Sequence, residues 1–121
     1  MRKYIATFLM ALLLIGCVSA TSEAYDGYPE EDTWVLNYQG WDIYVKAGTL
    51  DRYGHRVDAA PNFDAVILCI NGKKTEEHFC EFKSKGMVSL KMDGNFVRNN
   101  DFSNRLYTAI CDEFHYYFYG N

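Results

Sequence analysis

Hydrophobic and polar residues alternate in several short stretches of the chain, which is the pattern of a β-strand with one buried face. The clearest stretches are residues 41–46 (WDIYVK) and residues 88–92 (VSLKM), where every second residue is apolar. A weaker alternation covers residues 78–82 (HFCEF), and a short apolar segment covers residues 34–36. We predict a strand at each of the three alternating stretches.

One stretch is apolar without alternation. Residues 63–70 read FDAVILCI, which predicts a central strand covered on both faces. Asn71-Gly72 follows this stretch, and Asp93-Gly94 follows residues 88–92. Both dipeptides favour tight hairpin turns, so we expect consecutive hairpins with a last strand starting near Phe96.

The hydrophobic period changes in the C-terminal segment. At about 100° per residue, the apolar side chains of residues 102–118 fall on one broad arc, with Arg105 and Asp112 opposite,. This predicts an amphipathic helix over about residues 102–119, with Asp101 as its N-cap and Gly120 as its stop. Strands followed by one helix predict the α+β class, in which an antiparallel sheet of about five strands carries the helix on one face.

The N-terminus has the layout of an export signal. Arg2 and Lys3 precede an apolar run from Ile5 to Ile15, and small residues follow it. The run has eleven residues, whereas a membrane-spanning helix needs about 20. We therefore expect the chain to be exported, with this segment outside the folded domain.

The end of the signal, Leu14-Ile15-Gly16-Cys17, resembles the lipobox of bacterial lipoproteins. The resemblance covers only this segment. It implies that residues 1–16 are removed, that Cys17 carries a lipid, and that the chain is anchored at the outer membrane. The alternative is ordinary cleavage after Val18-Ser19-Ala20, which would remove residues 1–20 and leave a soluble periplasmic or secreted chain.

Charge and composition distinguish an acidic N-terminal tether from a globular domain in the rest of the chain. Removing residues 1–16 takes away two basic residues and no acid, which leaves 10 Lys and Arg against 16 Asp and Glu and a net charge of -6. Phosphate backbones bind basic surfaces, so we expect no nucleic-acid partner. Residues 17–32 combine small residues with five acids, which predicts a flexible acidic tether before a single globular domain over residues 33–121.

Three cysteines remain beside Cys17, and an exported chain is in an oxidising compartment. Cys69 and Cys80 enclose the Asn-Gly turn, so we predict a Cys69–Cys80 disulfide between neighbouring strands. Cys111 lies at the edge of the apolar arc of the helix and could pair with either of them instead. The cysteine left over is then a buried thiol or, alternatively, a reactive one.

A surplus of aromatic residues is the main functional signal, because interface cores are enriched in Tyr, Trp and Arg. Aromatic residues make up 17% of the chain. The candidates for partner binding are Tyr53, His55 and Arg56 in the polar segment 47–62, and Tyr116 and Tyr119 on the polar helix face. The alternatives are a solvated loop and Tyr used as amphipathic surface cover.

Signals for catalysis or metal binding are weaker. His55 or His115 could act as the general base of a small nuclease-like hydrolase, although the acidic balance disfavours such a substrate. Glu76-Glu77-His78 has metal-ligand residue types, but neighbours on a strand face different directions. The lysines at positions 73, 74, 83, 85 and 91 would protect a sheet edge from aggregation or, alternatively, form a docking patch for an acidic partner,.

Together these patterns predict an exported, lipid-anchored binding protein of the cell envelope, of the inhibitor, immunity or exclusion-factor type. It would recognise a protein partner through loops and exposed tyrosines. We expect no enzymatic activity, no cofactor and no bound metal. The small secreted hydrolase using His55 or His115 is the alternative.

Overall fold

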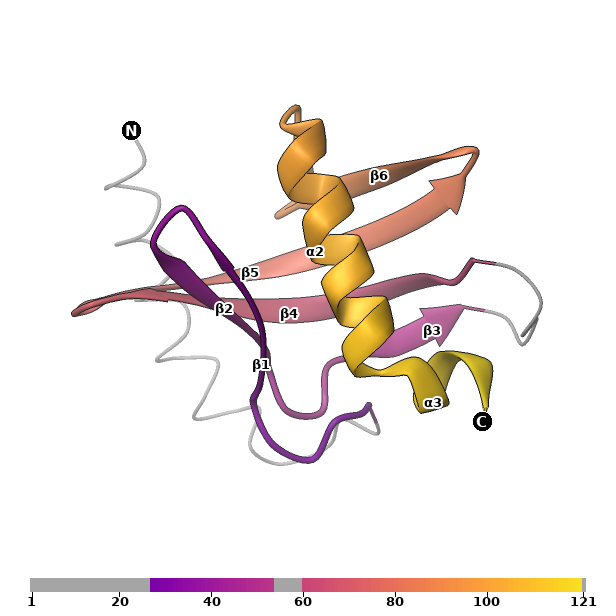
Figure 1. The fold of residues 1–121 in the computed structure, drawn as a ribbon, viewed down its shortest axis with the longest axis horizontal. Coiled ribbons are helices and arrows are strands. Elements are labelled where there is room, and N and C mark those ends of the chain that lie inside the picture. Colours follow the sequence, from indigo (N-terminus) through magenta and orange to yellow (C-terminus); the bar gives the residue numbers. More distant parts are fainter. Residues whose placement is uncertain (1–26, 54–59, 121) are drawn as a thin grey trace.

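The computed structural model describes residues 27–53 and 60–120. Within these ranges the chain forms a seven-stranded antiparallel sheet followed by two helices (Figure 1). The strands are β1 (Thr33–Tyr38), β2 (Trp41–Val45), β3 (Asp51–Tyr53), β4 (Asn62–Asn71), β5 (Lys74–Lys85), β6 (Met87–Met92) and β7 (Asn95–Phe96). The predicted α+β class is confirmed, with more strands than the expected five.

The strands follow one another in the order β1-β2-β4-β5-β6-β7. Strand β3 departs from this order, because it pairs with the start of β4 while β2 pairs with the end of β4. It lies inside the segment 47–62, which we expected to be a loop throughout. The pairing Arg52↔Phe63 shows that part of this segment is instead built into the sheet.

Strand β4 is central, as predicted, but it is fully buried on one face only. Phe63, Ala65 and Ile67 have no exposed surface, whereas Val66 and Leu68 on the opposite face are half-buried. The prediction of two covered faces is therefore wrong. The apolar residues of the second face made the sequence of β4 look like that of a doubly covered strand, although α2 packs on the first face alone.

Two tight turns were predicted from Asn-Gly and Asp-Gly. Asp93 and Gly94 connect β6 to β7 with φ values of 52° and 85°, the combination that a type I′ hairpin requires. At the other site the turn is shifted by one residue, because Asn71 still pairs with Lys74 and Gly72 takes the positive φ of 61°.

The C-terminal segment forms two helices, α2 (Asn100–Glu113) and α3 (His115–Tyr119), separated at Phe114. The N-cap is Asn99, whose side chain accepts a hydrogen bond from the Phe102 N–H, so the predicted cap at Asp101 is wrong by two residues. Gly120 ends α3 with a φ of 75°, as predicted. Among the described residues, no helix is long and apolar enough to cross a membrane.

Helix α2 lies across one face of the sheet (Figure 1), and the core fills the space between them. At the end of the sheet near β3, this core is aromatic. The Phe63 ring lies 4.6 Å from that of Phe82, 5.6 Å from that of Tyr107 and 4.9 Å from that of Phe118. The buried Tyr107 hydroxyl donates a 2.7 Å hydrogen bond to the carbonyl oxygen of Pro61, which satisfies both polar groups,.

The folded domain begins before residue 33, where we expected the tether to end. Tyr28 forms an isolated β-bridge with Leu50, and its ring stacks 5.2 Å from the ring of Tyr117. Pro29 is buried, and its carbonyl oxygen accepts a hydrogen bond from Gly48. Residues 27–32 are therefore part of the domain, while residues 1–26, with the predicted signal and Cys17, lie outside the described residues.

Candidate functional site

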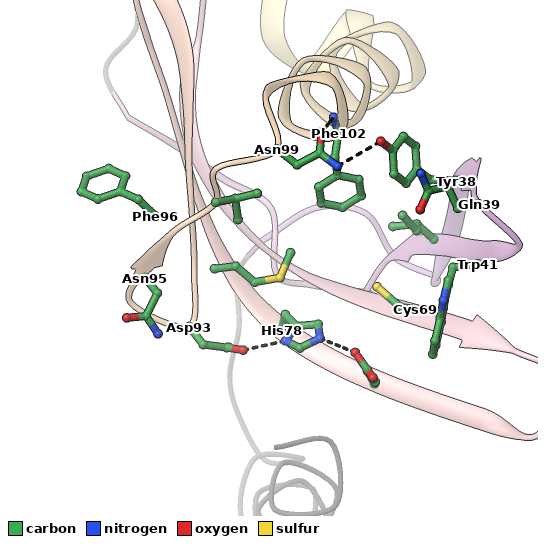
Figure 2. Close-up of a pocket in the computed structure, with 14 residues that line it drawn as sticks. Tyr38, Gln39, Trp41, Cys69, His78, Asp93, Asn95, Phe96, Asn99 and Phe102 are labelled. Atoms are coloured by element: carbon green, nitrogen blue, oxygen red, sulfur yellow. Dashed lines mark hydrogen bonds and ion pairs between the residues drawn. The ribbon is translucent and has the colours of Figure 1, made fainter. Parts of the chain in front are cut away.

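A pocket of about 500 Å³ opens on the helix-covered face of the sheet, at the end away from the aromatic core (Figure 2). Its floor comes from β2, β4, β5 and β6, and its walls come from the β1–β2 turn, the β6–β7 turn and the start of α2. A second hollow, along β5 and β6, is smaller, at about 290 Å³. We take the larger pocket as the candidate functional site.

The pairing of β4 with β5 explains why this end is open and polar. Phe63 pairs with Phe82, and further along the same face Ile67 pairs with His78 and Cys69 with Glu76. The N-cap of α2 is Asn99, at the rim of the pocket, so α2 does not extend over the last pairs. The alternation of β5 thus directs Glu76 and His78 into the hollow.

His78 lies between two carboxylates. Its Nε2 is 2.9 Å from Oε1 of Glu76, and its Nδ1 is 2.6 Å from Oδ2 of Asp93 (Figure 2). The His78 side chain is only 11% exposed, and the two carboxylates are 25% and 31% exposed. Two carboxylates against one imidazole leave at least one net negative charge, whatever the protonation state of the ring.

The β6–β7 turn fixes the carboxylate of Asp93. Its Oδ1 accepts a 3.0 Å hydrogen bond from the Phe79 N–H, and its own N–H donates a 2.8 Å bond to the Phe79 carbonyl oxygen. Its positive φ belongs to a backbone region that Asp and Asn enter more readily than most residues,. The second carboxylate oxygen is therefore held in place to face His78.

Aromatic side chains form the opposite wall. The Tyr38 ring lies 4.9 Å from that of Phe102, and Trp41 closes the side of the pocket next to Cys69 (Figure 2). The Tyr38 hydroxyl accepts a 3.2 Å hydrogen bond from the Asn99 side chain and donates a 3.1 Å bond to Asp101. The start of the helix and the β1–β2 hairpin are thereby tied together at the rim.

The chemistry of these groups favours binding a cation over catalysis. Both ring nitrogens of His78 are engaged, so neither is free to move a substrate proton. Burial raises the pKa of the Cys69 thiol to about 12, so this thiol is not a nucleophilic thiolate at neutral pH. Among the described residues that line the pocket there is no Lys or Arg, which leaves its negative charge available to a ligand.

A metal ion is not suggested by this cluster. The two carboxylates bond to opposite nitrogens of one ring, so their oxygens face His78 and do not converge on a common point. Across residues 27–53 and 60–120, no group of three or more His, Cys, Asp or Glu side chains is arranged to hold a metal ion.

The partner-binding residues predicted from the sequence lie elsewhere. Tyr53 is in β3, where its hydroxyl donates a hydrogen bond to the Asp64 carboxylate. Tyr116 and Tyr119 are in α3, next to β3 and at the far end of the sheet from the pocket (Figure 1). His55 and Arg56 lie outside the described residues.

The two tyrosines of α3 differ in exposure. Tyr116 is 77% exposed, whereas Tyr119 is half-buried, with its ring 4.9 Å from that of His115. His115 itself is exposed on the outer side of the short helix. None of these side chains lines the pocket, so a hydrolase centre at His115 gains no support from their geometry.

The predicted Cys69–Cys80 disulfide is absent, and Cys69, Cys80 and Cys111 are free buried thiols. The strand register gives the reason. Cys69 is opposite Glu76 and Cys80 is opposite Ala65, so the two cysteines are four positions apart along the ladder. A disulfide needs Cα atoms within about 7 Å of each other, which this separation exceeds.

Comparison with known proteins gives no relative for this arrangement: no protein family, no curated protein and no solved structure matches the chain. The site is therefore interpreted from its own geometry.

Sequence reasoning missed this site because its residues come from separate segments. It noted Glu76-Glu77-His78 as one unit, whereas the structure uses Glu76 and His78, which share a face at spacing two, and adds Asp93 from the next turn. The missed signal was an acidic residue and a histidine at alternate positions of one strand, with an Asp-Gly turn closing the neighbouring strand.

Proposed function

We propose that this chain is an exported, lipid-anchored binding protein of the cell envelope, of the inhibitor, immunity or exclusion-factor type. It recognises a protein partner by accepting one of the partner's cationic side chains into the pocket. The observation that carries the proposal is the Glu76–His78–Asp93 cluster, a net negative group beside aromatic walls in a concave site.

Arginine fits the pocket better than lysine does. Its planar guanidinium forms paired hydrogen bonds with carboxylates and stacks on aromatic rings. The pocket offers both kinds of contact, because the Glu76 carboxylate bonds to His78 through Oε1 alone, while Tyr38 and Trp41 form the wall. Partial burial of the carboxylates strengthens such a pair relative to one on an open surface.

The predicted use of exposed tyrosines changes in this proposal. Tyr38 contributes to the pocket wall, while Tyr53 and Tyr116 lie at the other end of the sheet and are not needed for contact with the cation. No nucleic acid is proposed as a partner, because the pocket is acidic and the mature chain carries a net charge of -6,.

The cellular location belongs to the proposal and rests on the sequence. The apolar run ending in Leu14-Ile15-Gly16-Cys17 favours lipid attachment at Cys17, and more than one acyl chain is needed for firm anchoring. Mass spectrometry of the N-terminal peptide from membranes tests this directly. A diacyl- or triacyl-modified Cys17 is expected, and an unmodified N-terminus at Thr21 would contradict it.

The pocket is tested by capturing partners from envelope extracts with the mature chain and with a Glu76→Gln/Asp93→Asn variant. The amides preserve side-chain size, and the amide introduced at position 93 retains an oxygen that can accept from the Phe79 N–H. A matched control, Asp112→Asn/Glu113→Gln, removes two exposed acids from the end of α2.

The proposal expects a partner that the wild type and the control retain and the pocket variant loses. Purified partner should then bind the pocket variant about tenfold or more weakly, as expected for losing a charge-assisted pair. Substituting single exposed arginines of the partner should identify the one that enters the pocket. A partner retained equally by all three proteins would refute the role of the pocket.

A further inference from the structure

A second groove, of about 290 Å³, lies on the face of the sheet opposite α2. Lys83 and Lys85 come from β5, and Lys91 comes from β6. Their side chains share a face because β5 and β6 pair with Lys83 opposite Ser89 and with Glu81 opposite Lys91. The buried neighbours Phe82 and Leu90 point to the core on the other face, so alternation places the lysines together,.

The groove combines positive charge with exposed apolar surface. Among the residues that line the groove, three lysines outnumber one carboxylate, that of Glu81, so the lining is net positive in a chain that is acidic overall. Asp64 lies opposite Glu81 on β4 and interacts with Lys83 alone of the three lysines. Met87 is 69% exposed and Phe96 is 67% exposed, and both line it. The Lys91 ammonium lies 5.1 Å from the centre of the Phe96 ring, which holds this lysine along the edge of the groove,.

The groove is bordered by an unpaired strand edge. Strand β7 pairs with Lys91 and Met92 only, and the Val97 N–H donates one further bond to the Leu90 carbonyl oxygen. Within the described ranges, no strand pairs with the outer edge of β6 over residues 87–89. Backbone groups along such an edge can pair with an added strand from another chain.

We propose that this groove binds an extended acidic segment of a partner protein, added as a strand along residues 87–89 of β6. Side chains of an added strand point alternately to the two faces of the sheet. Acidic side chains at every second position would lie on the groove face, where they reach across β6 toward Lys83 and Lys85 of β5 and lie near Lys91, Met87 and Phe96. This surface lies on the opposite face from the cation pocket, so the proposal does not depend on that pocket.

A protein segment suits these observations better than an anionic membrane does. The unpaired edge offers backbone hydrogen bonds that a peptide can use and a lipid headgroup cannot use in the same way. The groove is also concave, and the net negative charge of the mature chain opposes approach to an anionic bilayer,.

The test uses the mature chain and a fluorescent peptide in which Glu and Val alternate. The groove variant is Lys83→Gln/Lys85→Gln/Lys91→Gln. The matched control is Lys73→Gln/Lys74→Gln, which neutralises two exposed lysines at the opposite tip of the β4–β5 hairpin. Thermal unfolding checks that both variants stay folded, as expected for substitutions at exposed or half-buried side chains.

The peptide should bind the wild type and the control alike, and the groove variant about tenfold or more weakly. Added salt should weaken the binding, and hydrogen exchange should slow at residues 87–89 when the peptide is bound. Three results would overturn the proposal: equal binding by the groove variant, unchanged exchange at residues 87–89, or binding to phosphatidylglycerol vesicles without binding to the peptide.

Discussion

The two ends of the helix-covered sheet face are built from the same pair of strands and have opposite properties. At one end Phe63 and Phe82 pair and stack beneath Tyr107 and Phe118. At the other end the same strands place Cys69 opposite Glu76, and the face opens into a pocket. Strand alternation decides which face a residue occupies, and the path of the helix decides which end of that face is covered.

This difference divides stability and recognition between the two ends. The aromatic end removes large apolar surfaces from water and satisfies the Tyr107 hydroxyl, so it should account for much of the folding free energy,. The polar end keeps two carboxylates partly exposed around His78. A partly exposed charge contributes little to stability but remains available to a ligand.

The difference in stability between the two ends is tested most directly by truncating one side chain at each end. Phe82→Ala should lower the free energy of unfolding by about 3–5 kcal/mol, because it removes a buried ring from the aromatic cluster,. Glu76→Ala should lower it by clearly less, because a polar group that keeps some contact with water is removed and no buried ring is lost,. Urea unfolding followed by circular dichroism measures both, and equal losses would contradict the division of roles.

Substitutions at the start of α2, at the rim of the pocket, should have an intermediate effect on the free energy of unfolding. Asn99→Ala should cost about 1 kcal/mol, because it removes the cap on the Phe102 N–H,. Asp101→Ala should cost clearly less than Asn99→Ala, because the pair of Asp101 with Arg105 is more than half exposed,. Thermal unfolding of the two variants decides whether Asn99 or the residue predicted from the sequence is the true cap.

The smallest expected effect is a difference in the alkylation rates of two thiols on the helix-covered face, Cys69 at the pocket and Cys80 closer to the aromatic end. Burial raises the pKa of Cys69 to about 12 and also raises that of Cys80 well above its ordinary value. Both thiols are therefore protonated at pH 8, and iodoacetamide should modify them slowly in the folded chain. Cys69 should react before Cys80, because it is 8% exposed at the pocket and Cys80 is fully buried. Peptide mass spectrometry over time measures the order.

The same pKa shifts set a direction for stability. Because the folded thiol pKa lies above its ordinary value of 9.0, the fold should lose stability as pH rises from about 9 toward 12,. Finding Cys69 and Cys80 joined in the purified chain would contradict both the reactivity order and the strand register.

The sequence predicted the positions of the strands and the helix better than it predicted which faces of the strands are buried. Alternation located β2 and β6, a continuous apolar run located β4, and the apolar arc located the C-terminal helix, because these are local signals. The same signals could not show that β4 has one open face or that β3 pairs within the segment 47–62. Both depend on which segments meet in space, which is set by long-range packing and not by local periodicity.

The site was harder to predict for the same reason. Tyr53, Tyr116 and Tyr119 stood out by composition, but they lie away from the pocket, whereas Glu76, His78 and Asp93 acquire their arrangement only through the β4–β5–β6 register. The disulfide prediction failed on the same point: flanking a turn does not place two cysteines opposite each other. Only the register, counted residue by residue, separates Cys69 from Cys80.

The central claim is that the open end of the sheet face binds a cationic side chain. The most direct measurement is an NMR titration of the ¹⁵N-labelled chain with N-acetyl-arginine amide, following the Trp41 indole N–H and the backbone amides of Gln39 and Asn95. These residues line the pocket, and a single side chain without further contacts should bind in the millimolar range.

The account predicts shifts clustered at the pocket in the wild type and in the Asp112→Asn/Glu113→Gln control. The shifts should be lost in the Glu76→Gln/Asp93→Asn variant. Shifts of equal size in the pocket variant, or shifts spread evenly over the surface of the sheet, would contradict the claim.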